Sequence, residues 1–257
     1  MPSVAAPKRT LFATAAMGTR FEIVIEARET PALRAVGELA IREIEALHTK
    51  LSFHATDSLL SHVNRTASGS AVRLDADTFE LLRDAIHVWQ ASHGAFDITR
   101  GAGMDAVILD ERTRSIRFTR KNISLDLGGI AKGHAVDRAA AVLREHCVTA
   151  ALVHGGTSSI AAIGCPADHE GWGVAIAPSH THTVFLCDET LSASSGALRP
   201  HIVDPATRAF IEGPRVAAVI GPSARLGDAW STAAAVLGTR PAGMGPEWQI
   251  IIERSEA

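Results

Sequence analysis

Residues 125–137, Leu-Asp-Leu-Gly-Gly-Ile-Ala-Lys-Gly-His-Ala-Val-Asp, constrain the fold of this chain more than any other segment. The apolar run over residues 123–127 predicts a strand, and the glycines and small residues after it predict a tight turn into a helix. N–H groups exposed at such a helix start, together with the helix dipole, attract phosphate. Asp126 and Lys132 add a carboxylate and a cation, which suits a phosphorylated ligand held with a metal ion. The alternative is a glycine turn that only packs the helix tightly against the strand.

Composition excludes several classes of function. The chain has 257 residues, enough to bury a sizeable core in one large domain or two small ones. Its net charge is −3 without a Lys/Arg run, so we expect no nucleic-acid partner. Aromatic residues make up only 5% and tyrosine is absent, which argues against a surface for stacking bases. No apolar stretch approaches the roughly 18 residues that would span a membrane.

The cysteines and the N-terminus bear on the compartment. Cys147, Cys165 and Cys187 are odd in number, far apart and without a C-x-x-C pair, so the sequence predicts neither a disulfide framework nor a zinc knuckle. A reducing compartment fits this pattern best. Residues 1–17 lack the apolar core of roughly 7–15 residues that a signal peptide has, and they contain no cysteine to lipidate. We therefore expect a cytoplasmic protein, or a periplasmic one if the sequence is a trimmed form.

Hydrophobic periodicity predicts strands and helices that mix without a strict alternation. Alternating apolar residues predict a strand over 21–25, and Thr30 followed by Pro31 predicts the start of a helix that reaches Leu51. A capping box of Asp77 and Glu80 predicts a second helix up to Gly94. Further helices are expected from Gly133 to about Cys147 and over 226–237, and further strands over 115–119, 123–127, 150–153, 173–177, 183–187, 191–194, 201–203, 216–220 and 248–252.

This mixture favours an α+β fold of two closely packed lobes with mixed sheets and flanking helices. The chain contains no repeats, low-complexity tracts or linker-like runs. We therefore expect a single domain over residues 1–257.

Two short motifs could contact a ring. Met17, followed by a glycine, offers a soft apolar surface beside exposed backbone. Phe96 could pack under an aromatic ligand while Asp97 bonds its polar edge. Taken alone, each motif is better explained structurally, the first as the lead-in to a strand and the second as a helix C-cap followed by a core phenylalanine.

Two further motifs suggest a general base and metal ligands. His201 is a candidate general base for a hydroxyl nucleophile, because histidine ordinarily has a near-neutral pKa, and the alternative is a half-buried histidine in a strand. Asp204 lies three residues on, on the opposite face of an extended segment, so the two do not form a simple pair. Asp228 and Thr232 share one helix face and are hard oxygen ligands that suit Mg²⁺. The alternative is an Asp in the favourable first turn, with Thr232 bonded within the helix.

Taken together and in order, the motifs resemble those of the ApbE family, the FAD:protein FMN transferases. They are Met17-Gly18-Thr19, Ser52 with Ser58 and Asn64, Gly94-Ala95-Phe96-Asp97, the segment at 125–137, Gly155-Gly156, Ser195-Gly196, His201-Ile202-Val203-Asp204-Pro205, and Asp228 with Thr232. The resemblance implies a T-fold-like fold. It also implies Mg²⁺-dependent transfer of FMN from FAD to a Thr or Ser hydroxyl of a partner flavoprotein, with release of AMP.

The resemblance also implies roles for single residues. It implies that FAD is bound by Met17, Phe96, Asp97, Asp126, Lys132 and His201. It implies that Mg²⁺ is bound by the Gly129 carbonyl, Asp228 and Thr232. It implies that His201 is the catalytic base, and Asp126 is the next candidate to accept the proton.

The chain departs from the family pattern at three positions. His54 stands where the family has an aromatic residue after the first helix, His134 stands in place of a tyrosine, and Arg208 stands in place of a glycine. Two other functions therefore remain open. One is Mg²⁺-dependent hydrolysis of FAD to FMN and AMP, and the other is FAD binding without turnover.

Overall fold

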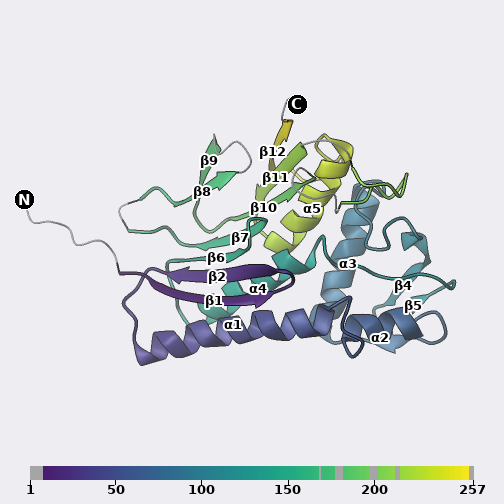
Figure 1. Ribbon diagram of the computed structural model, residues 1–257, viewed down its shortest axis with the longest axis horizontal. Coiled ribbons are helices and arrows are strands. Elements are labelled where there is room, and N and C mark those ends of the chain that lie inside the picture. Colours follow the sequence, from purple (N-terminus) through teal and green to yellow (C-terminus); the bar gives the residue numbers. More distant parts are fainter. Residues whose placement is uncertain (1–7, 168, 177–181, 197–201, 212–214, 255–257) are drawn as a thin grey trace, which may run out of the picture.

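A seven-stranded antiparallel sheet forms the larger part of the computed structural model (Figure 1). The structure describes residues 8–167, 169–176, 182–196, 202–211 and 215–254. In spatial order the strands are β1 (Thr10–Ala16), β2 (Thr19–Ile25), β6 (Ala151–Gly155), β7 (Ser159–Ile163), β10 (Thr190–Ser195), β11 (Arg215–Gly221) and β12 (Gln249–Arg254).

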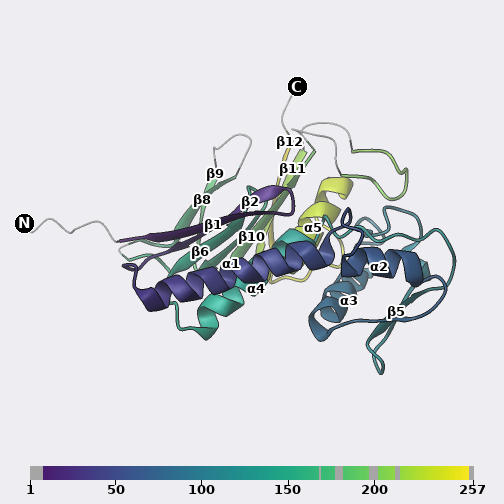
Figure 2. The same ribbon diagram turned by 60° about the horizontal axis from the view of Figure 1, so that its bottom comes forward.

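Both faces of this sheet are covered. Helices α1 (Pro31–Leu51), α4 (Ala131–Glu145) and α5 (Ala224–Leu237) lie on one face, as Figure 2 shows. The hairpin of β8 (Trp172–Ile176) and β9 (His182–Leu186) packs on the other. Alternate residues of β7 therefore enter two different cores: Ala161 packs with the helices and Ile160 with the hairpin. Within the described residues, no helix is both long and apolar enough to cross a membrane.

A smaller part lies at the C-terminal end of α1 (Figures 1 and 2). It contains α2 (Leu59–Thr66), α3 (Ala76–Ala91), a 3₁₀ turn at Met104–Ala106, and a sheet of β3 (Val72–Arg73), β5 (Ser115–Phe118) and β4 (Val107–Asp110). One continuous apolar cluster joins Phe79 and Leu82 of α3 to Ile44 of α1 and to the large sheet. The structure thus confirms an α+β fold of two closely packed lobes, and the single domain over residues 1–257 stays a prediction.

Several expected elements differ in the structure. Thr30 caps α1 as predicted, with its hydroxyl accepting the Leu33 N–H at 3.1 Å. The cap of α3 is Asp75 and not Asp77, because the helix begins at Ala76 and the Asp75 carboxylate accepts the Thr78 N–H at 3.1 Å. Residues 123–127 do not form the expected strand. Of the expected strand over 201–203, Val203 makes an isolated β-bridge, Ile202 belongs to no strand, and His201 lies outside the described residues.

The expectation that the cysteines form no disulfide was wrong. Cys165 and Cys187 are bonded, with their Cα atoms 5.0 Å apart and a separation of 22 in the sequence. Cys165 follows β7 and Cys187 precedes β10, and these strands are neighbours in the sheet. The bond therefore closes the base of the β8–β9 hairpin. Cys147 is exposed and free.

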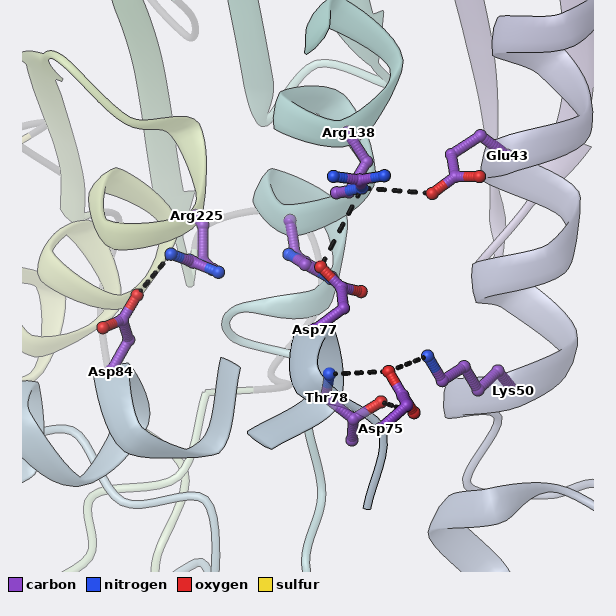
Figure 3. Close-up of polar contacts among 9 residues, drawn as sticks. Glu43, Lys50, Asp75, Asp77, Thr78, Asp84, Arg138 and Arg225 are labelled. Carbon is purple, nitrogen blue, oxygen red and sulfur yellow. Dashed lines mark hydrogen bonds and ion pairs between the residues drawn. The ribbon is translucent and has the colours of Figure 1, made fainter. Parts of the chain in front are cut away.

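Ion pairs join the helices of the two parts, as Figure 3 shows. Lys50 of α1 pairs with Asp75 at 2.8 Å, and the Asp75 carboxylate also accepts the Thr78 N–H. Burial acts to raise the Asp75 pKa, but Lys50 and Thr78 outweigh it and lower the pKa from 3.8 to about 2. The charged carboxylate is therefore the form that the folded state favours.

Arg138 of α4 extends this network between α1 and α3. Its guanidinium pairs with Glu43 at 3.1 Å and lies 3.9 Å from Asp77 (Figure 3). The hydrogen bond from His134 lowers the Asp77 pKa against the effect of burial, and Arg138 lowers it further. Arg225 of α5 pairs with Asp84 of α3 at 2.6 Å. Three helices of the larger part are thus tied to α3 by charge as well as by apolar packing.

The Asp75 carboxylate should stabilise the fold at neutral pH and lose this effect in acid. A folded-state pKa of about 2 against an ordinary value of 3.8 means that its contribution is complete above pH 4 and disappears as the pH falls towards 2. We expect Asp75→Asn, which keeps a side chain suited to capping, to flatten this part of the stability–pH curve. Urea midpoints measured between pH 2 and 7 test this. Identical slopes in both proteins below pH 4 would show that Asp75 does not carry the effect.

Candidate active site

A cleft of about 1250 Å³ lies between the large sheet, the β8–β9 hairpin and the loops that join the two parts. Seven residues singled out from the sequence line it: Phe96, Asp97, Asp126, Gly129, Lys132, Asp228 and Thr232. Met17 does not line it, although its neighbour Gly18 does. Met17 and Gly18 form the turn between β1 and β2, and the Met17 N–H donates to His48 Nδ1 at 3.1 Å. His201 lies outside the described residues, while the next two residues line the cleft.

Asn64 fixes the extended segment that enters the site. Its side-chain amide donates to the Leu125 carbonyl at 3.0 Å and accepts the Leu125 N–H at 2.8 Å. The Asp126 N–H donates to the Ile98 carbonyl at 2.7 Å. A side chain and a loop thus provide the bonds that a neighbouring strand would otherwise supply. Residues 123–127 are therefore held in place without belonging to a sheet.

The glycine turn after this segment is closed by its own charged side chains. The Asp126 carboxylate accepts the Gly128 N–H at 2.9 Å, and Lys132 Nζ donates to the Gly128 carbonyl at 3.0 Å. A Cβ on Gly129 would lie 3.2 Å from both the Phe96 ring and Thr232 Oγ1. Phe96, only 2% exposed, is thus the floor beneath the turn. The turn presents Asp126 and Lys132 to the cleft on a fixed backbone.

The start of α4 faces a carboxylate of the protein itself. The Gly133 N–H donates to Asp228 Oδ2 at 3.1 Å, and the Ala131 N–H donates to the Leu127 carbonyl at 2.8 Å. These two N–H groups are therefore bonded within the protein, and a phosphate held at this helix start stays a prediction. Asp228 takes the favourable position near the positive end of the helix dipole.

Gly133 has a packing role, as the alternative interpretation of the glycine turn proposed. A Cβ at this position would lie 2.1 Å from the Ala224 carbonyl oxygen of α5. Asp137, one turn further along α4, caps α5 by accepting the N–H groups of Ala224 at 2.9 Å and Arg225 at 3.0 Å. The two helices therefore meet closely where Asp228 leaves α5.

Asp228 is a buried carboxylate, 2% exposed, in the second turn of α5 and not at an exposed helix start. Burial raises the pKa of its carboxyl group, and the positive charge of Lys132 and the Gly133 N–H offset part of this rise. A charged carboxylate in such a place is stabilised by a cation beside it. The environment of Asp228 therefore suits a metal ligand.

Thr232 makes the hydrogen bond within its helix that the sequence offered as the alternative to metal binding. Its hydroxyl donates to the Asp228 carbonyl at 3.0 Å within the helix, and it also lies 3.2 Å from Ser194 Oγ. Thr232 also lines the cleft, next to Gly129. Carboxylate, hydroxyl and carbonyl oxygens are the ligands that Mg²⁺ prefers.

Few charged groups are available to hold a metal ion here. Within the part of the chain that the structure describes, no three His, Cys, Asp or Glu side chains gather in metal-binding geometry. A cation at Asp228 would therefore need neutral protein oxygens, water and the oxygens of its substrate, which is a common arrangement for Mg²⁺. The residues present fit that ion when a phosphate is bound with it.

Two basic residues of the cleft were missed from the sequence. Arg100 lines it with a left-handed backbone (φ 54°), and its guanidinium lies 3.7 Å from Asp126. His154 of β6 also lines it and lies 3.1 Å from Glu22. Arg100 comes shortly after Asp97, and His154 directly before the Gly155-Gly156 pair. This proximity to known motifs was the available signal.

The three departures from the family pattern have structural explanations. His134 is buried and its Nε2 lies 3.0 Å from Asp77 Oδ2, away from the cleft lining. Arg208 adopts the left-handed conformation that glycine favours (φ 59°), and its guanidinium donates to the Gly101 carbonyl at 2.8 Å. His54 is exposed and outside the cleft lining.

Comparison with known proteins gives one consistent answer. The family model described as "ApbE family" matches residues 17–107 and 100–245. The chain is 25% identical to the FAD:protein FMN transferase of Haemophilus influenzae, over 86% of this chain and 79% of that one. It is 26% identical to the FAD:protein FMN transferase of Chlamydia trachomatis, over 91% and 86% of the two chains.

Solved structures have the same fold. The ApbE protein of Thermotoga maritima matches with a TM-score of 0.81 at 22% identity, over 97% of both chains. The flavin transferase ApbE of Vibrio cholerae matches with a TM-score of 0.82 at 20% identity, over 96% of this chain and 93% of that one. At this identity the structural matches establish the fold, and the family model covers most of the sequence. The chain belongs to the ApbE family.

Proposed function

We propose that this protein is an FAD:protein FMN transferase that requires Mg²⁺. It moves FMN from FAD to a Thr or Ser hydroxyl of a partner flavoprotein and releases AMP. One observation carries the proposal: the buried carboxylate of Asp228 lines a cleft together with Thr232 and Gly129. Asp126 and Lys132 line the same cleft. Both curated relatives are named for this activity, and the chain covers most of their length.

The cleft residues divide the tasks of binding. Lys132 places a cation beside the Gly129 turn, where it can neutralise a phosphate oxygen. Asp97 holds Thr99 through two bonds of 2.6 Å to one carboxylate oxygen and keeps its other oxygen for a ligand donor. At the Met17–Gly18 turn, the residue that would contact FAD is Gly18, which lines the cleft. A Cβ placed on Gly18 would have no atom within 4 Å, so the space around it is open.

The reaction needs alignment, neutralisation of charge and a proton acceptor. The acceptor hydroxyl oxygen forms a bond to the FMN phosphorus, and the bond from that phosphorus to the bridging oxygen breaks. The bridging oxygen leaves with AMP. Bound Mg²⁺ supplies positive charge for the pyrophosphate oxygens. His201 accepts the hydroxyl proton, and Asp126, in the cleft lining, is the next candidate for that role.

Incubation with FAD, Mg²⁺ and an acceptor peptide that contains a Thr or Ser, followed by mass spectrometry, tests the function. Transfer adds the mass of FMN to the peptide and releases AMP. Hydrolysis releases both FMN and AMP without modifying the peptide, and simple binding returns intact FAD. Either of the last two results, obtained with a flavoprotein that a known transferase does modify, would replace our proposal with the corresponding alternative.

Asp228→Asn should reduce Mg²⁺-dependent turnover by about 100-fold or more, because it removes the one carboxylate of the proposed metal site. Asparagine retains an oxygen for the Gly133 N–H, so the fold should persist. Thr232→Ala should have a smaller effect, since water can replace a hydroxyl ligand, and Thr232→Ser is its matched control. Initial rates over a range of Mg²⁺ concentrations test this. Unchanged rates at limiting Mg²⁺ would rule out Asp228 as a ligand.

His201→Ala should lower kcat by roughly 10²–10⁴-fold, as expected for loss of a general base. The affinity for FAD should change little, because a base acts on the hydroxyl proton in the transition state. The acidic limb of the pH–rate profile should also disappear. FAD titration and kcat measured from pH 5 to 9 separate the two effects. Lost FAD binding with normal kcat at saturation would make His201 a binding residue.

The compartment is a further proposal. The cytoplasmic expectation depended partly on the expectation that the cysteines form no disulfide. Cys165 and Cys187 do form one. Disulfides persist in oxidising compartments, so the bond between Cys165 and Cys187 supports the periplasmic alternative. We therefore propose that the acceptor flavoprotein is met in an oxidising compartment.

A further inference from the structure

We propose that the side chain of Phe210 is the surface on which a planar ring of FAD stacks. The proposal depends on the proposed function, because FAD supplies the two rings, isoalloxazine and adenine. Phe210 would then recognise a ring of FAD, while other residues of the cleft recognise its pyrophosphate.

Phe210 combines two properties. It lines the cleft, and half of its surface (50%) is exposed. Single exposed apolar side chains are common on proteins, so the exposure alone has no meaning. Among the described residues that line the cleft, however, the other aromatic side chain is Phe96, which is 2% exposed beneath the glycine turn. Phe210 is therefore the aromatic surface that a ligand in this cleft can cover.

The segment that carries Phe210 is held by hydrogen bonds on both sides. Val203 and Phe210 form a β-bridge, and the Ile211 N–H donates to the Ile202 carbonyl at 3.0 Å. Arg208 ties the turn between them to the Gly101 carbonyl of the loop that follows Asp97. The backbone that carries the ring is thus held in place. A rigid aromatic side chain loses little entropy when a ligand stacks on it.

The remaining lining matches a ligand that is charged at one part and flat at another. The charged groups come from Asp126, Lys132 and Asp228. Apolar side chains of the sheet and the hairpin line the same cleft: Leu152, Ile160, Val174, Ile176, Leu191 and Val216. A planar ring on Phe210 would be covered by such side chains, while its phosphates meet the charges. His54, which stands where the family has an aromatic residue after the first helix, is exposed and does not line this cleft. A different residue is therefore needed to bind the ring.

Phe210→Ala should weaken FAD binding by about 10-fold or more, the loss typical when a stacked aromatic side chain is removed. Phe210→Trp should retain binding, because it keeps a flat aromatic face. Two phenylalanines of similar exposure outside the cleft lining serve as controls: Phe185→Ala, at 57%, and Phe53→Ala, at 44%, should bind FAD like the parent protein.

Calorimetric titrations of FAD, FMN and ADP into each variant identify the ring. A parallel loss for FMN assigns Phe210 to isoalloxazine, and a parallel loss for ADP assigns it to adenine. Equal FAD affinity in Phe210→Ala and Phe185→Ala would overturn the assignment of Phe210 and leave the proposed function intact. A parent protein that binds no FAD at all would overturn both.

Discussion

The close approach of α4 to α5 is the contact on which the site depends. It requires a glycine at position 133, because any Cβ there would collide with the Ala224 carbonyl. The same approach lets the Gly133 N–H reach Asp228, and lets Asp137 cap α5 from α4. Two polar contacts and one steric requirement therefore fix where the buried carboxylate sits. Gly133 and Asp137, both in the 125–137 segment, thus act as a frame that positions Asp228 on another helix.

Burial of Asp228 explains why the contacts between α4 and α5 matter for its carboxylate. A carboxylate removed from water is costly unless hydrogen bonds and positive charge compensate it. Gly133 and Lys132 supply part of this compensation, and the pKa remains raised. The compensation is therefore incomplete, and the Mg²⁺ proposed for this site would supply further positive charge. A fully neutralised carboxylate would form a stable ion pair and leave little driving force to bind a metal with its phosphate.

Local patterns in the sequence predicted the elements that they describe. Thr30 with Pro31 gave the start of α1, and the spacing of Asp228 and Thr232 placed both on one face of α5. The edge strand β1 was missed because its apolar residues do not alternate cleanly, and Leu11 is 64% exposed. β7 was missed for the opposite reason: both its faces are covered, so all five residues are buried and no alternation remains.

Contacts between distant residues were beyond such patterns. Gly133 and Asp228 lie 95 positions apart, and Asn64 and Leu125 lie 61 apart, so spacing gives no sign that they meet. The disulfide was missed in the same way, because Cys165 and Cys187 are adjacent only after the hairpin between them folds back across the sheet. The resemblance to a family indicated which motifs belong to one site, but it did not explain which contacts bring them together. The structure shows these contacts. The Asn64 side chain bonds both backbone groups of Leu125, Gly133 allows α4 and α5 to meet, and Asp137 caps the helix that carries Asp228.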